Sequence, residues 1–379
     1  MNDGQVPFVD IRRETASLKD ELVEAVERVL DHGRFILGDE VKAFEALMER
    51  EAGFPKGSVI AVSSGTDALL SALMAHGVGP GDRVVTTPFS FFATAGVIAR
   101  LGARPFFVDI DPVTLNLDPA GLASLNPEDF KALLIVHVFG RTADVEACRA
   151  WCQAGDVAII EDAAQAVLGR DETGKPVGLL GAVGCFSCFP TKNLGAAGDA
   201  GFQVAEDPAM AGRLRTLRTH GQISAYDSVM VGGNFRMDAL QAAVLSVKLR
   251  HLKRWTRERY HRADRYDRAF RDRGLDRALG LPPMGTPTTW VVHQYVVRSP
   301  ERDRLRAHLE QMGVASQIYY PKPLHRMEAF ARVGETNGPL PEAERACEEV
   351  LALPVSPQLS VEAQDRVIDA VAAFDGFSI

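Results

Sequence analysis

Lys192 lies between an apolar run, residues 184–189, and a loop rich in glycine and alanine. Desolvation disfavours an ammonium group among apolar and small residues, so its pKa falls and a Schiff base with an aldehyde becomes accessible. The glycines that follow allow the backbone and a bound molecule to approach closely. A solvated lysine needs none of these surroundings, and the sequence therefore predicts that this amine does chemistry.

Asp162 stands at the end of a second apolar run, in the stretch "EDAAQA". An unpaired carboxylate there would be costly, so we expect a cationic partner. The protonated ring nitrogen of pyridoxal phosphate is such a partner, because a carboxylate beside it lets the ring accept electrons from a substrate. Gln165 lies one helical turn further on and would face the same side. Considered alone, the motif also fits a capping aspartate with an incidental glutamine.

The stretch "SSGTDALL", residues 63–70, places small and hydroxylated residues directly before a helix. Free N–H groups and the helix dipole at such a start can hold a phosphate. A plain N-cap by Ser64 or Thr66 explains the stretch equally well. The loop, the acid and the lysine nevertheless follow strands of one expected sheet, in an order that can surround a single ring.

Apolar runs of strand length alternate with helical patterns through the first two thirds of the chain. Most runs are continuous rather than alternating, as in strands covered on both faces. This order predicts an α/β fold with a mainly parallel, seven-stranded sheet wrapped by helices. Strands are expected at residues 58–64, 83–87, 105–110, 133–138, 157–161, 184–189 and 201–205, with helices at 67–76, 93–101 and 144–153 among them.

The pattern changes at residue 237, where a long helix rich in arginine and alanine begins and runs to about residue 271. We expect it to connect a large α/β domain, residues 1–245, to a smaller α+β domain, residues 246–379. The small domain is expected to contain strands at 290–297 and 317–320 and helices at 303–312, 341–350 and 362–374.

The composition is that of an ordinary globular protein, with 46% hydrophobic and 24% charged residues in 379. The net charge of −8 argues against a nucleic-acid surface, and acidic residues are interleaved with the arginines of the long helix. We find neither a signal-peptide pattern nor an apolar run long enough to span a bilayer, and we expect a cytoplasmic protein.

The five cysteines lack regular spacing, which fits reduced thiols. Cys185 and Cys188 form a CxxC pair, a pattern that can serve redox chemistry or half of a metal site. Neither this pair nor Cys148 with Cys152 is accompanied by a histidine-rich loop. Buried apolar strand residues are therefore the favoured interpretation and no metal site is predicted, with a zinc or redox protein as the rival.

Six stretches, in the expected order over nearly the whole chain, resemble those of the DegT/DnrJ/EryC1/StrS aminotransferases. They are "SSGTDALL", "EDAAQA", "FSCFPTKNLG", "RTHGQ", "GGNFRMDALQAAVLSVKL" and "YYPKPLHRMEAF". Members of this family have fold type I and use pyridoxal phosphate to aminate keto sugars, which are mostly nucleotide-linked. The resemblance therefore implies a pyridoxal-phosphate-dependent aminotransferase.

The resemblance also implies a role for each matching residue. Lys192 is similar to the lysine that forms the internal aldimine, Asp162 to the acid at the pyridinium nitrogen, and Gln165 to the residue beside the cofactor hydroxyl. Further cofactor-binding matches are Gly65, Thr66 and Ser187 at the phosphate, Phe91 stacked on the ring, and Asn234, which in this family reaches the phosphate of the neighbouring subunit. The last match implies a homodimer with shared active sites.

His220, Tyr320 and His325 lie in motifs that line the sugar-nucleotide side of such sites, although each fits a structural role equally well. The implied reaction moves an amino group from glutamate to a keto sugar by a ping-pong aldimine/ketimine mechanism, with Lys192 as the base. The stretch "RMDALQAAVLSVKL" is closer to relatives that aminate the 3-position of nucleotide-linked sugars. The alternatives are a 4-keto sugar, a keto-cyclitol, or a non-catalytic regulatory or binding protein with the same fold.

Overall fold

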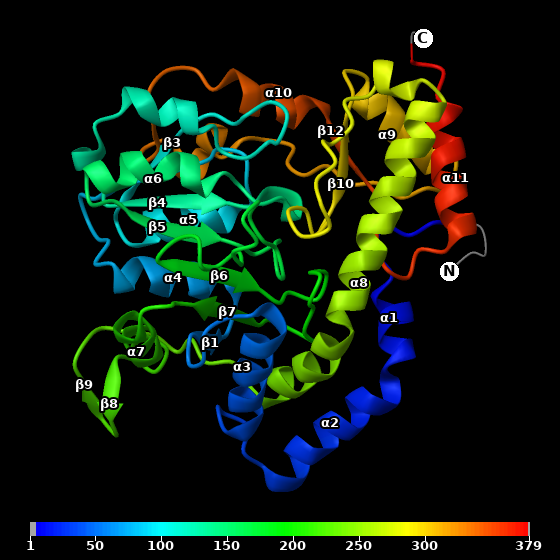
Figure 1. The fold of residues 1–379 in the computed structure, drawn as a ribbon. Helices are drawn as coiled ribbons and strands as arrows, with labels where there is room; N and C mark the ends of the chain where they lie inside the picture. The colour runs from blue at the N-terminus through cyan, green and yellow to red at the C-terminus, as the bar shows by residue number, and fades with distance from the viewer. Residues whose placement is uncertain (1–4, 378–379) are drawn as a thin grey trace.

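A sheet of eight strands organises the larger lobe of the computed structural model, which describes residues 5–377 (Figure 1). The strand order is β1-β7-β6-β5-β4-β2-β3-β11, and β7 alone runs against the direction of the others. The strands are β1 (Val59–Val62), β2 (Arg83–Thr86), β3 (Arg104–Phe107), β4 (Ala132–Val136), β5 (Ala158–Asp162), β6 (Val183–Ser187), β7 (Gly201–Val204) and β11 (Glu335–Thr336).

The predicted α/β fold with its mainly parallel sheet is confirmed. All seven expected strands are present, because long apolar runs are buried on both faces of this sheet. The eighth strand, β11, is only two residues long and pairs with the edge strand β3 through Phe106 and Phe107. A pairing this short, made by a segment from the far end of the chain, has no periodic signal in the sequence.

Helices cover both faces of the sheet and bury two apolar clusters against it. These helices are α3 (Asp39–Ala52), α4 (Gly65–Ala75), α5 (Phe92–Arg100), α6 (Val145–Ala154) and α7 (Pro208–Leu217). The connections include the 3₁₀ helices η1 (Pro119–Ser124), η2 (Pro127–Asp129) and η3 (Val138–Gly140), and a small hairpin of β8 (Gln222–Ser224) and β9 (Asp227–Ser228). The parallel strands thus all deliver their carboxyl ends to one edge of the layer.

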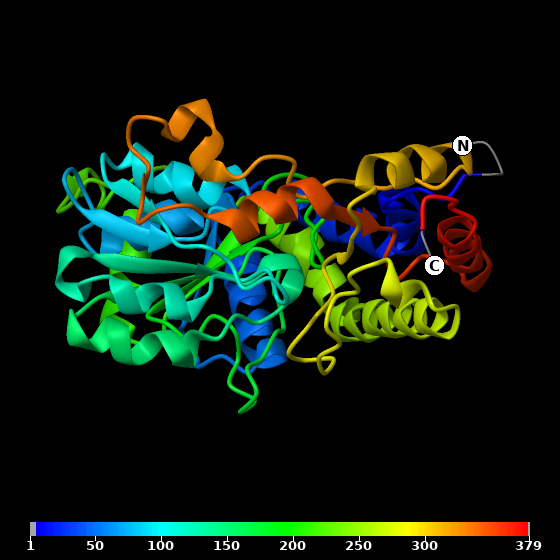
Figure 2. The ribbon, with the colours of Figure 1, turned by 90° about the horizontal axis from the view of Figure 1, so that it is seen from above.

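The long helix α8 (Ala239–Asp272) joins this lobe to the smaller one and packs against α2 (Lys19–His32) and α3 at its beginning. Figure 2 shows the sheet and its helices at one end, and α8, α9 and α11 grouped at the other. The remaining elements are α1 (Ile11–Ser17), η4 (Leu275–Arg277), β10 (Tyr295–Arg298), α9 (Arg302–Gln311), η5 (Leu324–Arg326), η6 (Glu328–Phe330), α10 (Pro341–Glu349), β12 (Val350–Leu353) and α11 (Val361–Ala372).

The prediction of a strand at residues 317–320 is wrong. In this segment Gln317 alone makes a bridge, to Ala352, and the chain then follows an irregular path along the wall of a cavity in the larger lobe. Of the residues that suggested a strand, Tyr319 and Tyr320 line that cavity, while Ile318 packs against two apolar clusters. The strand expected at 290–297 is shorter, β10, and it pairs with β12, which the sequence pattern did not indicate.

The expected boundary at residues 245 and 246 falls inside α8, and the division into two domains stays a prediction. Two pairings cross it. Val6 bridges Val314 in the smaller lobe, and β11 joins the sheet of the larger one. Within residues 5–377 we find no helix that is long and apolar enough to cross a membrane.

Candidate active site

A cavity of about 430 Å³ opens at the carboxyl ends of β4, β5 and β6, beside the start of α4. Apolar side chains and many convergent polar groups form its wall, a combination suited to a polar small molecule. Its lining includes Ser64, Gly65, Thr66, Phe91, Asp162, Gln165, Ser187, Lys192, His293, Gln294 and Tyr320. Eight of these eleven are residues that the sequence singled out.

Lys192 is held by a tight turn after β6. Its backbone N–H donates to the carbonyl of Phe189 at 2.8 Å. The next residue, Asn193, donates from Nδ2 to the carbonyl of Val291 (3.0 Å) and accepts through Oδ1 from the ring of His293 (3.1 Å). Burial lowers the pKa of the Lys192 amine to about 8, although the charge of Asp162 acts in the opposite direction. A sizeable fraction of this amine is therefore neutral near neutral pH.

The Asp162 carboxylate ends β5 and is buried. Its Oδ2 accepts a hydrogen bond from Thr94 Oγ1 at 2.7 Å, and its Oδ1 accepts one from the N–H of Ala164 at 3.2 Å. Burial raises the pKa of this carboxyl, while the hydrogen bond from Thr94 lowers it. Among the described residues, no cation lies within ion-pairing distance of Asp162, so the cavity contains a buried acid that lacks a bound positive partner.

The start of α4 is pressed directly against the sheet. A Cβ atom added to Gly65 would lie 2.7 Å from the Cβ of Ser187 at the end of β6. Ser64 caps the helix by accepting from the N–H of Asp67 at 3.0 Å. The N-cap interpretation is thus correct for Ser64, and it leaves Gly65, Thr66 and Ser187 together on the cavity wall, where first-turn N–H groups and hydroxyls can bind an anion.

Gln165 is oriented by two hydrogen bonds across the cavity wall. Its Oε1 accepts from the N–H of Phe139 at 2.6 Å, and its Nε2 donates to the hydroxyl of Tyr320 at 3.1 Å. Burial raises the pKa of that hydroxyl, so it stays protonated. Phe91 also lines the cavity, and its side chain is 61% exposed, which leaves a ring face free to cover a flat ligand.

Three other candidates do not line this cavity. His220 is exposed in the loop after α7, and Asn234 is exposed with its Oδ1 accepting from Arg236 Nε at 2.8 Å. His325 is mostly buried in η5, where Nε2 lies 3.0 Å from a carboxylate oxygen of Glu344 and Nδ1 has no hydrogen-bond partner. Within the described chain, the structure therefore brings Tyr320, but not these three, to the site.

Comparison with known proteins identifies the family of this chain. The model of the DegT/DnrJ/EryC1/StrS aminotransferase family matches residues 16–372. The chain belongs to this family. A "Pleiotropic regulatory protein" from Geobacillus stearothermophilus is 45% identical over 370 residues, which cover 97% of this chain and 98% of the relative.

Two further members of the family are also similar over almost their whole length. The "UDP-N-acetyl-3-dehydro-alpha-D-glucosamine 3-aminotranferase" of Acidithiobacillus ferrooxidans is 38% identical, with 97% of each chain covered. The crystal structure of S. venezuelae DesV in complex with a ketimine intermediate superposes with a TM-score of 0.91 at 38% identity, covering 97% of this chain and 98% of that one. Our chain is accordingly a pyridoxal-phosphate-dependent aminotransferase.

The residues of this chain fit the cofactor of the DegT/DnrJ/EryC1/StrS family. Three groups line the same cavity. They are a lysine with a lowered pKa, a buried carboxylate without an ion-pair partner, and a helix start with free N–H groups. These groups complement the aldehyde, the ring nitrogen and the phosphate of pyridoxal phosphate, in that order.

Sequence reasoning missed the residues that support this site. Thr94 orients Asp162, and Asn193 and His293 fix the turn that carries Lys192. Burial keeps the pKa of His293 well below its ordinary value, so the ring is neutral beside the Lys192 amine. The sequence offered little signal, because Asn193 stands directly after Thr191 and Lys192 and His293 directly before Gln294, so neither is an isolated polar residue.

The CxxC pair does not favour the zinc or redox rival. Cys185 and Cys188 are buried, and burial raises the pKa of both thiols. A thiol that resists ionisation is a poor nucleophile and a poor metal ligand. Cys185 instead packs within the apolar cluster on one face of the sheet, as a small hydrophobic residue would.

Proposed function

We propose that this enzyme transfers the amino group of glutamate to the 3-keto group of a nucleotide-linked sugar. The observation that carries the reaction type is the placement of Lys192 and Asp162 in one cavity of about 430 Å³, at the strand ends of a fold shared with sugar aminotransferases. When bound there, pyridoxal phosphate supplies an electron sink that stabilises negative charge on the carbon next to the transferred nitrogen.

Lys192 would act as the proton carrier. An amine with a pKa near 8 is a base strong enough to remove a proton from the Cα of the donor, and its conjugate acid can deliver that proton to the cofactor C4′. The turn fixed by Asn193 and His293 positions the amine for both transfers. The same two transfers in reverse order would convert the keto sugar to the amino sugar.

Asp162 would hold the protonated ring nitrogen, with Thr94 fixing the direction in which its carboxylate points. Gly65, Thr66 and Ser187 would bind the phosphate, Phe91 would cover the ring, and Gln165 would contact the ring hydroxyl. Tyr320 lies against Gln165 and would border the sugar. His325 and His220 are proposed to lie further out, toward the nucleotide.

We further propose a homodimer in which Asn234 of one protomer completes the phosphate site of its partner. Asn234 is exposed and lies outside the cavity of its own chain. The nearby segment is unusually apolar for a surface, because Ile223, Tyr226 and Val231 are between 64% and 98% exposed. Such a group of side chains is typical of a covered interface.

The choice of the 3-position rests on relatives. The A. ferrooxidans relative is named for a 3-dehydro sugar nucleotide, and a 38% identical Streptomyces venezuelae relative is named "dTDP-3-amino-3,4,6-trideoxy-alpha-D-glucose transaminase". A 4-keto sugar and a keto-cyclitol remain the alternative substrates. Because the G. stearothermophilus relative is named a regulatory protein, a regulatory role is the second candidate function.

The visible absorbance of the purified protein separates these functions. We expect a yellow holoenzyme whose band is lost on addition of glutamate and regained on addition of a 3-keto nucleotide sugar, with Lys192→Ala unresponsive. Recovery with a 4-keto sugar or a keto-cyclitol alone would replace the proposed substrate. A protein that binds the cofactor but ignores glutamate at every pH would favour the regulatory role.

A further inference from the structure

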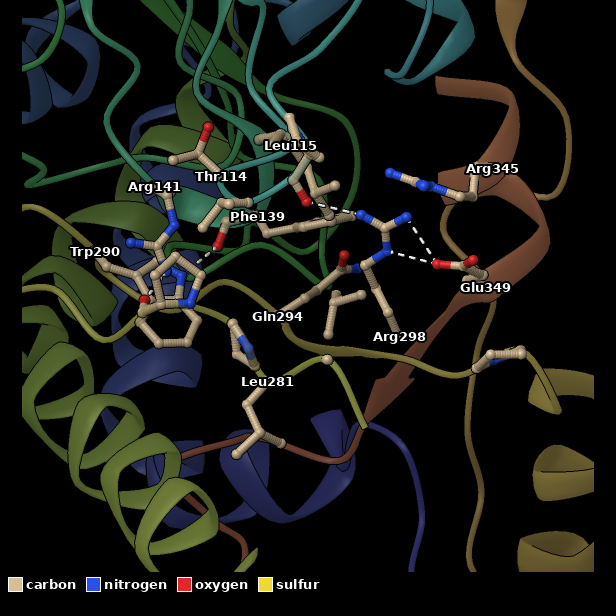
Figure 3. Close-up of a pocket in the computed structure, with 18 of the residues that line it drawn as sticks. Thr114, Leu115, Phe139, Arg141, Leu281, Trp290, Gln294, Arg298, Arg345 and Glu349 are labelled. Carbon is tan, nitrogen blue, oxygen red and sulfur yellow. Dashed lines mark hydrogen bonds and ion pairs between the residues drawn. The ribbon is translucent and has the colours of Figure 1, made fainter. Parts of the chain in front are cut away.

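A second cavity, of about 400 Å³, is lined by Phe139 and shares Gln294 with the candidate active site (Figure 3). The loop at residues 112–115, the segment at 278–283, β10 and α10 contribute to its wall. Three arginines and a single carboxylate line it, namely Arg141, Arg298, Arg345 and Glu349. The proposed reaction makes no use of this cavity.

Arg141 is the cation without a counterion. Its guanidinium lies 4.6 Å from the ring centre of Trp290 and donates to the carbonyl of Pro283. Within residues 5–377 no carboxylate lies within ion-pairing distance of this group. Burial lowers the pKa of Arg141 to about 10, the opposite of what a neighbouring carboxylate would do. A bound anion would remove this electrostatic cost.

The other two cations are already compensated. Arg298 pairs with Glu349 at 2.7 Å and donates to the carbonyl of Pro112 at 2.7 Å, while Arg345 pairs with Glu342. Figure 3 shows Arg298 and Glu349 joined on one side of the cavity and Arg141 against Trp290 on the other. The wall thus has excess positive charge, and that excess is centred on Arg141.

A second, independent feature also points to a ligand. Gln294 is only 6% exposed, and its Oε1 has no hydrogen-bond partner. This side chain lines both this cavity and the candidate active site. A buried acceptor without a donor costs free energy, and a turn of the amide that brings this oxygen to the cavity surface would let a hydroxyl group of a bound molecule satisfy it. Leu115, Leu281 and Val296 supply the apolar part of the wall.

We propose that this cavity binds a small hydroxylated organic anion, with its oxyanion on Arg141 and a hydroxyl donating to Gln294. The volume, about 400 Å³, accommodates a molecule the size of a hydroxy acid or a short sugar phosphate. Carboxylate and phosphate satisfy an arginine by the same charge-assisted hydrogen bonds, so the oxyanion is the shared chemistry.

Calorimetric titration of the cofactor-loaded enzyme with D-glycerate and with glycerol 3-phosphate tests this site. We expect one of them to bind, glycerol not to bind, and Arg141→Gln to weaken the affinity at least tenfold. Arg141→Lys should retain more of the binding than Arg141→Gln. Leu281→Trp, which fills the cavity without touching the cation, should also abolish binding. The anion that binds more tightly shows whether the site prefers a carboxylate or a phosphate.

A matched control is Arg268→Gln, which removes a charge from α8 where Arg268 pairs with Asp264 on the surface. It should bind as the wild type does. Binding by Arg141→Gln and Leu281→Trp at wild-type affinity would overturn the proposal, as would equal binding of glycerol or binding of neither anion. Because heat of binding requires no turnover, the result does not depend on the proposed substrate, and glutamate-induced bleaching of the cofactor tests that function separately.

Discussion

At the scale of single residues, the low pKa of Lys192 leads to a prediction about how the enzyme acquires its cofactor. Only the neutral amine attacks an aldehyde, and its pKa is about 8. The capture rate of pyridoxal phosphate by the cofactor-free protein should therefore rise about tenfold per pH unit below pH 8 and level off above it. Stopped-flow absorbance between pH 6 and 9 measures this profile.

Asp162→Asn provides the check on that profile. The charge of Asp162 raises the pKa of the lysine, so its removal should move the inflection to lower pH. A flat profile in the wild type would contradict the role assigned to burial, and an inflection at higher pH in the variant would contradict the role assigned to the charge of Asp162.

Thr94 allows a second prediction at this scale. Thr94→Val keeps the shape of the side chain but removes the 2.7 Å hydrogen bond to Asp162. Hydrogen bonds to charged groups are worth about 1.5–3 kcal/mol, so kcat/KM for glutamate should fall roughly 10- to 100-fold. That hydrogen bond lowers the pKa of Asp162, and its loss raises the pKa, so the deficit should grow as the pH falls.

Thr256→Val is the matched control for this change. The Thr256 hydroxyl is also buried, but it donates only to the carbonyl of Leu252 within α8. Its activity should remain at the wild-type level. Equal losses in the two variants would mean that Thr94 acts through general stability rather than through Asp162.

The sequence identified the reacting groups better than the groups that support them. Lys192 follows a largely apolar run and Asp162 ends another, so both charges stand out in the sequence. Asp162 alone also fitted a capping role, and its combination with Lys192 and the stretch at 63–70 pointed to chemistry. Thr94, by contrast, is an ordinary hydroxyl in a helix, and its contact with Asp162 depends on the packing of α5 against the sheet. Single-residue chemistry is local in sequence, while its orientation comes from tertiary packing.

At the scale of elements, the close contact between α4 and β6 forms the proposed phosphate site. Gly65→Ala would place a Cβ atom 2.7 Å from the Cβ of Ser187, so α4 must shift away from the strand. We expect the affinity for pyridoxal phosphate to fall at least tenfold, measured by equilibrium dialysis. Gly212→Ala, in the helix α7 with open space around it, should leave affinity unchanged and stabilise the fold by about 0.5–1 kcal/mol.

The elements themselves were predictable wherever burial was complete. β4 is a continuous apolar run, β5 begins as one before Glu161 and Asp162, and both strands lie within two residues of the expected bounds. The segment at 317–320 is also rich in apolar and aromatic residues, but Tyr319 and Tyr320 line a cavity, so composition alone assigned it wrongly. The sequence pattern also gave no indication of β11, because its pairing depends on how the two lobes meet.

At the scale of the whole molecule, the exposed apolar side chains around the β8–β9 hairpin predict a partner surface. Tyr226 is 98% and Val231 85% exposed. We expect a dimer of the 41.2 kDa chain in light scattering, and Val231→Asp should shift it toward the monomer with a parallel loss of activity. A fully active monomer would contradict shared sites.

Subunit complementation decides whether Asn234 serves its own site or that of its partner. Homodimers of either variant should have little activity. Lys192→Ala lacks the amine, and in Asn234→Asp the new carboxylate repels the phosphate. In a mixed dimer, the protomer that keeps Lys192 would receive an intact Asn234 from its neighbour. Random mixing yields half mixed dimers with one complete site of two, so about a quarter of wild-type activity should return. If Asn234 served its own chain, neither site of the mixed dimer would be complete, and the mixture would show only the average of its parents.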